Sequence, residues 1–148
     1  MELKLKRESA VLWAKKICIC TLSLMILGIA CGLNIAATQG ADPITVFYDG
    51  LGKMMGINVG LTVSILNVAL VAVVFFSNRK YIHIGTVIYM LVLGTFIQVG
   101  IHLYNLMNIP NVFMWQVVVS LFGCLLAFIG LGGFISIDIG IDPWTAAA

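Results

Sequence analysis

Two short motifs built on glycine, aspartate and proline hold the residues best placed to do chemistry in this chain. The first is Gly40-Ala-Asp-Pro-Ile-Thr45 and the second is Gly140-Ile-Asp-Pro-Trp-Thr145. Asp before Pro is a good helix start, because the carboxylate accepts hydrogen bonds from free backbone N–H groups and Pro suits the first turn. Gly40 and Gly140 allow the sharp bend that precedes such a start. We therefore expect each motif to break one helix and begin another.

The chemistry of such a break depends on its depth in a membrane. Helix N-termini in the bilayer interior attract anionic groups, whereas Asp42 or Asp142 beside them favours a cation or a proton. In a simpler interpretation both aspartates only cap helices at the ends of spans. Asp138 lies in the last turn of an apolar helix, where it can reach water as an interfacial acid. The candidate binding residues are Asn34, Gln39, Asp42, Thr45, Asp138, Asp142, Trp144 and Thr145, and the structural motif residues are Gly40, Pro43, Gly140 and Pro143.

The elements that position these motifs are predicted to be membrane helices. Of 148 residues, 61% are apolar and 9% are charged, whereas soluble domains are near half apolar and a quarter charged. A soluble globule of this length has no core large enough for so much apolar surface. The predicted fold is an all-α integral membrane protein. It has a basic segment at 1–16 and one transmembrane domain at 17–148, with spans at about 17–38, 57–77, 84–106 and 112–137 and a short interfacial or re-entrant helix at about 43–55.

Basic residues predict the orientation of these spans. The N-terminal segment and the loop between the second and third spans share one side if all spans cross. They hold Lys4, Lys6, Arg7, Lys15, Lys16, Arg79 and Lys80. The other side holds only Lys53. The N-terminus is therefore predicted to be cytoplasmic.

The two motifs also belong to a longer internal repeat. Between positions 28–45 and 128–145, seven of 18 residues are identical, Gly32 and Gly132 among them. Three crossings separate the copies, so they face opposite ways through the membrane, as in many secondary transporters. The second copy is incomplete, because the short helix and two spans that follow the first copy have no counterpart. We expect either an N-terminal fragment of a six-span protein or a complete four-span protein.

Several function classes lack their sequence signals. There is no Gly-rich phosphate loop with Lys and Ser/Thr, no G-x-S-x-G and no H-E-x-x-H. His83 and His102 have no acidic residue at ligand spacing, and the four cysteines lie in apolar runs without metal-site or thioredoxin spacing. We predict no enzyme activity, no metal, no cofactor and no nucleic-acid partner. The predicted partner is the lipid bilayer, and a small solute and a homo-oligomer are both compatible with the sequence.

Four glycine-containing stretches carry a resemblance to a known family. They are Gly28-Ile-Ala-Cys-Gly32, Gly40-Ala-Asp-Pro43, Gly56-Ile-Asn-Val-Gly60 and Gly140-Ile-Asp-Pro-Trp144. From about Gly28 to its end the chain resembles the bacterial YczE/YyaS/YitT-type multi-span membrane proteins. Members commonly show a Gly-x-Gly-Pro-Trp-Asp-like string at the first motif, whereas here Asp42 replaces the second Gly and Ile44-Thr45 replaces Trp-Asp. The resemblance implies a bacterial plasma (inner) membrane location and a longer chain, and it implies no reaction.

The inverted repeat and the broken-helix motifs favour a secondary transporter or channel-like permease for a small solute, driven by gradients. The alternative is a non-transporting accessory protein that supports secretion or the regulation of a partner. The depth of the motifs separates these hypotheses. Two motifs near the midplane that face a shared cavity favour transport, and two motifs at opposite surfaces without a cavity favour the accessory role.

Overall fold

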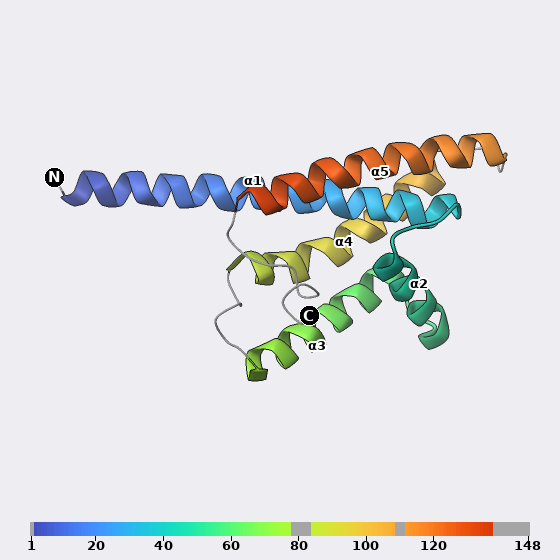
Figure 1. The fold of residues 1–148 in the computed structure, drawn as a ribbon, viewed down its shortest axis with the longest axis horizontal. Coiled ribbons are helices and arrows are strands. Elements are labelled where there is room, and N and C mark those ends of the chain that lie inside the picture. Colours follow the sequence, from blue (N-terminus) through green and yellow to red (C-terminus); the bar gives the residue numbers. More distant parts are fainter. Residues whose placement is uncertain (1, 78–83, 109–111, 138–148) are drawn as a thin grey trace.

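The computed structural model describes residues 2–77, 84–108 and 112–137, and every regular element within these ranges is an α-helix. The helices are α1 (Glu2–Ala37), α2 (Pro43–Met55), α3 (Val59–Ser77), α4 (Ile84–Leu106) and α5 (Phe113–Ser136) (Figure 1). The all-α prediction is confirmed for these residues. The short helix was predicted at its observed bounds, and α3, α4 and α5 begin and end within two residues of the predicted spans.

Helix α1 is longer than the span predicted at 17–38. It runs for 36 residues, which corresponds to about 54 Å. The basic N-terminal segment continues this helix, because it contains good helix formers and no glycine or proline occurs before Gly28. In Figure 1 the first turns of α1 extend beyond the other helices. The part that is apolar enough to cross a membrane is Val11–Ala37.

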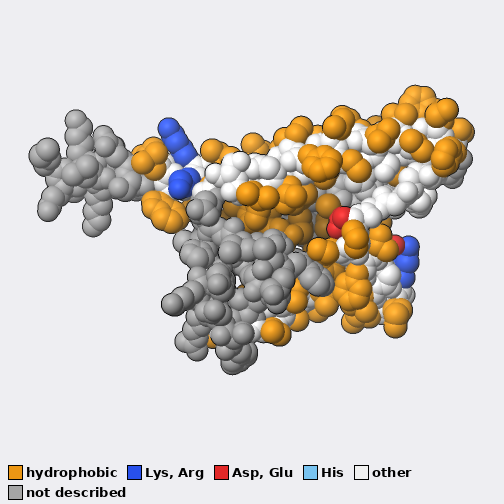
Figure 2. All heavy atoms as spheres, in the orientation of Figure 1, with side chains coloured by type: hydrophobic (Ala, Val, Ile, Leu, Met, Phe, Trp, Pro, Cys, Tyr) orange, Lys and Arg blue, Asp and Glu red, His pale blue; other side chains and the backbone are white. Residues whose placement is uncertain are grey.

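Three helices are individually long and apolar enough to cross a membrane. They are Val11–Ala37 of α1, Ile88–Leu106 of α4 and Phe113–Ser136, which is α5. Helices α2 and α3 meet the same criterion only as a pair bent by 108°, so the described residues hold three candidate spans, or four if this pair is one span. Figure 2 shows apolar side chains along the visible face of α5 and over α2 and α3. Such a surface is compatible with insertion into lipid.

Helix α1 is the centre of the bundle. It packs along both α4 and α5, while α3 packs against α4 and α2 packs against α3. In Figure 1, α1 and α4 run in the same direction, and α3 and α5 run in the opposite direction. The four long helices therefore alternate in direction along the chain, as successive membrane crossings must.

Glycines bring the helix backbones close together, as expected for association in lipid. A Cβ added at Gly32 of α1 would lie 2.8 Å from Gly100 Cα of α4, and one added at Gly130 of α5 would lie 2.7 Å from the backbone N of Leu27. Gly132, by contrast, has open space around it among the described residues.

Candidate functional site

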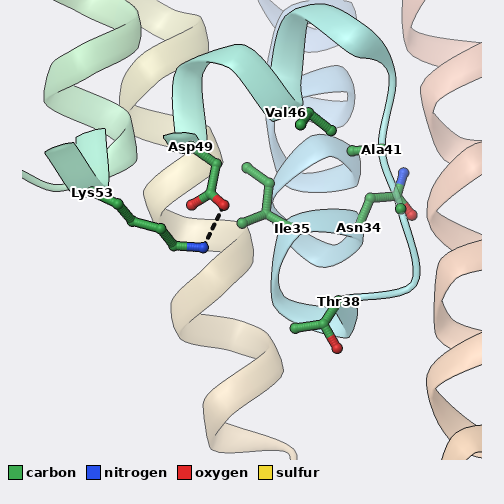
Figure 3. A pocket seen from close by; sticks show the side chains of 8 residues that line it. Asn34, Ile35, Thr38, Ala41, Val46, Asp49 and Lys53 are labelled. Carbon is green, nitrogen blue, oxygen red and sulfur yellow. Dashed lines mark hydrogen bonds and ion pairs between the residues drawn. The ribbon is translucent and has the colours of Figure 1, made fainter. Parts of the chain in front are cut away.

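The chain reverses direction directly after α1. Thr38 and Gly40 both have positive φ angles, of 57° and 126°, and the Thr38 N–H donates to Ile35 O at 3.2 Å. The following residues run back beside α1, so that Ala41 and Asn34 line the same small cavity (Figure 3). The bend predicted at Gly40 is confirmed, because a φ of 126° favours glycine.

Asp42 and Pro43 begin α2 as their residue types predict. The Oδ2 atom of Asp42 accepts a hydrogen bond from the Thr45 backbone N–H at 3.1 Å, and Pro43 occupies the first turn. The helix ends at Gly56, whose left-handed φ of 67° stops it after 13 residues. The helix start and its short length both follow from local chemistry.

One cavity beside the break extends along α1. Asp42 and Thr45 line a cavity together with Cys31, which is six residues before the end of α1 at Ala37. At 1.5 Å per residue this is about 9 Å along the helix axis. The chain thus folds back beside the apolar segment of α1 instead of leaving it.

The larger of two neighbouring cavities lies between residues 39–42, α1 and α5. Its volume is about 480 Å³, which is within the usual range for small-molecule sites. Its polar lining consists of Asn34, Gln39, Asp42, Ser120 and Cys124. The remaining walls are mostly aliphatic, with one aromatic ring from Phe128. This mixture of apolar walls and a few converging polar groups is typical of ligand sites.

Helix α5 holds the two amide side chains of this cavity. Ser120 Oγ donates to Asn34 Oδ1 at 3.3 Å, and Gln39 Nε2 donates to Gln116 Oε1 at 2.8 Å. Asn34 Nδ2 also lies 3.9 Å from Cys124 Sγ. A Cβ at Gly123 would lie 2.5 Å from Asn34 Oδ1, so the absence of a side chain there leaves room for the amide.

A second cavity of about 330 Å³ also includes Asp42 in its lining. Its other polar side chains are Cys31, Thr45, Tyr48 and Tyr89, and its remaining walls are aliphatic residues of α1, α2, α4 and α5. The Tyr48 hydroxyl donates to Asn67 Oδ1 of α3 at 3.0 Å in a buried contact. This hydrogen bond joins α2 to α3.

A third, smaller cavity of about 220 Å³ lies between the end of α1, residues 40–41 and α2. It shares Asn34 with the 480 Å³ cavity and includes the ion pair between Lys53 Nζ and Asp49 Oδ2, at 2.6 Å (Figure 3). Both charges belong to one turn of α2, and the lysine side chain is mostly exposed. This pair therefore neutralises itself and leaves Asp42 as the distinctive charge at the break.

Comparison with known proteins places the whole bundle in one family. The sequence model of that family matches residues 14–147. The chain belongs to DUF6198, a family of unknown function. Neither the curated proteins nor the solved structures gave a match. The function of this DUF6198 member must therefore be inferred from its cavities.

The structure brings together the four described candidates of the first motif. Asn34, Gln39 and Asp42 line the 480 Å³ cavity, and Thr45 joins Asp42 in the 330 Å³ cavity. The candidates of the second motif lie outside the described residues: Asp138, Gly140, Asp142, Pro143, Trp144 and Thr145.

Two cavity residues of α5, Ser120 and Cys124, were not predicted. With Gln116 they form a series at intervals of four, which places all three on one face of a helix. That spacing was the available signal for a polar face directed at the first motif.

Proposed function

We propose that this protein is a secondary transporter or permease for a small solute. The supporting observation is that the Asp42 break folds back beside α1 and lines two cavities, one of which reaches Cys31, six residues before the end of α1. Irregular backbone at membrane depth is tolerated only where protein covers it or where it lines a water-filled cavity. Broken helices around a cavity are the arrangement that many alternating-access transporters use.

In this proposal α1, α3, α4 and α5 cross a bacterial inner membrane and α2 is re-entrant. The alternating directions of the four long helices support four crossings, and the basic residues favour a cytoplasmic N-terminus. The second motif then forms the inverted counterpart of the first, as the repeat suggests. The bacterial inner membrane is what the resemblance to YczE/YyaS/YitT-type proteins implies.

In this proposal the solute passes Asn34, Gln39 and Asp42, which line the 480 Å³ cavity. The Gln39–Gln116 hydrogen bond joins the loop to α5 at an exposed position, where water competes with it. Breaking this contact lets the loop at 38–42 move away from α5 and opens the 480 Å³ cavity. Thr38 and Gly40, with their positive φ angles, are the hinge positions for that motion.

Cysteine labelling from each side of the membrane tests the proposal. Cys124 lines the 480 Å³ cavity, so a variant that keeps only Cys124 reports access to it. A charged, membrane-impermeant thiol reagent is applied to intact cells and to inside-out vesicles. We expect Cys124 to react from both sides, because alternating access exposes the cavity to each side in turn.

A variant that keeps only Cys18 is the matched control. Cys18 is exposed on α1 outside the cavities described above and lies at the cytoplasmic end of the predicted span, so we expect it to react with the charged reagent from the cytoplasmic side at most. Reaction of Cys124 from one side alone, at all reagent concentrations, would contradict transport. It would support the non-transporting accessory role instead.

A further inference from the structure

The charge of the two larger cavities is the first indication of what they bind. Asp42 is the only charged side chain among the described residues that line either cavity. Its carboxylate already accepts a hydrogen bond from the Thr45 N–H at the start of α2. The carboxylate therefore occupies the position at the helix N-terminus that an anionic ligand would otherwise take. An incoming anion would meet a like charge there, whereas a cation would meet an opposite one.

The walls of the 330 Å³ cavity indicate an organic cation rather than a metal ion. Tyr48 and Tyr89 line it together with leucine and isoleucine side chains. Calcium needs six to eight oxygen ligands, and magnesium keeps several waters, whereas most of this lining is hydrocarbon. Tyrosine rings and aliphatic walls suit the alkyl groups and the diffuse charge of an alkylammonium ion.

Both tyrosines are held in place. Tyr48 is 2% exposed and donates its hydroxyl hydrogen to Asn67, which is fully buried. Tyr89 is 8% exposed, and its ring packs against Phe134 with centroids 5.6 Å apart. The Asn67 Nδ2 atom is buried without a hydrogen-bond partner among the described residues. An unpaired polar group of this kind is costly in a structural core, yet the same side chain supplies the oxygen that holds the Tyr48 hydroxyl.

We infer that the solute of the proposed transporter is a small organic cation of the alkylammonium class, and that it binds in the 330 Å³ cavity against Asp42, Tyr48 and Tyr89. This inference depends on the proposed function only in treating the bound cation as the transported solute. Binding of the cation is measurable without transport. The cavity volume lies at the lower end of the range for small-molecule sites, which limits the ligand to a compact ion.

Cys31 is a native reporter of this site, because its side chain lines the same cavity. The full chain is purified in detergent, treated with N-ethylmaleimide, and the modification of each cysteine is followed by peptide mass spectrometry. The probes are choline and 3,3-dimethylbutan-1-ol, which has the same shape without the positive charge. Choline is expected to slow the alkylation of Cys31 and to leave that of Cys18 unchanged. The neutral alcohol is expected to need a concentration about 10-fold higher or more.

Asp42→Asn is the matched variant, because Asn caps a helix as well as Asp does and the fold is retained. We expect it to raise the half-protecting concentration of choline by about 10-fold or more, without changing that of the alcohol. Two results would overturn the inference. Choline and the alcohol could protect Cys31 equally well, or Cys31 could react with N-ethylmaleimide and neither probe could slow the reaction. If Cys31 does not react even without a probe, the Tm is followed instead, and a Tm that choline does not raise also overturns it.

The two proposals can fail separately. If Cys124 is labelled from both sides but Cys31 is not protected selectively by the cation, the transporter proposal stands and the organic-cation proposal is refuted. Cation-selective protection with labelling from one side alone leaves a cation-binding protein that does not transport.

Discussion

Replacing Gly32 by alanine should force α1 and α4 apart. The new Cβ would lie 2.8 Å from Gly100 Cα and 2.9 Å from the backbone N of Ile101, and it would also meet the carbonyl oxygen of Ile97. All three are backbone atoms, so no side-chain rotation relieves the contact. Normal carbon–carbon contacts are about 3.5–4.0 Å, so the two backbones must separate by about 1 Å at this point.

That separation weakens the packing on either side of the crossing. A gap of about 0.5–1 Å already removes a quarter to a half of the dispersion energy of each atom pair. Added methyl groups in a well-packed core typically destabilise by about 1–3 kcal/mol. Because only backbone faces Gly32, we expect a loss near the upper end, about 2–3 kcal/mol. For a chain of this size that corresponds to a decrease in Tm of roughly 5–10 °C.

Unfolding of the detergent-solubilised protein by heat or by added SDS measures this loss. Gly132→Ala is the matched control, because Gly132 is also helical but has no described atom within 4 Å. Alanine is a better helix former than glycine by about 1 kcal/mol, so the control should be neutral or slightly stabilising. If Gly32→Ala proved as stable as Gly132→Ala, the close contact between α1 and α4 would be refuted.

Three further substitutions test the break and its surroundings. Gly40→Ala should destabilise the folded protein by about 1–3 kcal/mol. An added Cβ would have no atom within 4 Å, but a φ of 126° is strained for alanine, so limited proteolysis at residues 38–42 should become faster. Tyr48→Phe removes the donor to Asn67 Oδ1 and should cost about 1–3 kcal/mol; together with Asn67→Leu it should cost less than the sum, in a double-mutant cycle of SDS unfolding. Gly123→Ala brings a Cβ to 2.5 Å from Asn34 Oδ1 and should push that side chain into the 480 Å³ cavity, which slower alkylation of Cys124 would show.

The bounds of α2 were predictable because a few neighbouring residues determine them. The Asp42 side chain caps the first turn, Pro43 presets its φ, and Gly56 takes the left-handed angle that ends the helix. Each of these effects acts within about one helical turn. The bounds of α3, α4 and α5 were predictable for a different reason, since the length of an apolar run is a direct requirement of bilayer thickness.

The pairing of the helices was not predictable in the same way. Lipid tails are as apolar as leucine, so a lipid-facing side and a protein-facing side of a membrane helix share residue types. Leu24 is fully buried whereas Leu22, two residues earlier on α1, is 55% exposed, and nothing in the residue type separates them. The contact of Ser120 with Asn34 depends on α5 lying against α1, which residue patterns within either helix do not specify.

The same distinction determines how much the internal repeat implies. Gly32 and Gly132 are identical in the alignment of the two copies, yet one packs against the α4 backbone and the other has open space among the described residues. An identical residue in the two copies therefore need not have equivalent packing partners, because the partner belongs to another helix. Four of the seven identities are Gly40, Asp42, Pro43 and Thr45 with their counterparts. In the first copy these residues set the bend, the cap and the first turn of α2, all of which are local. The shared residues of the first copy thus specify the shape of the break itself, whatever packs around it.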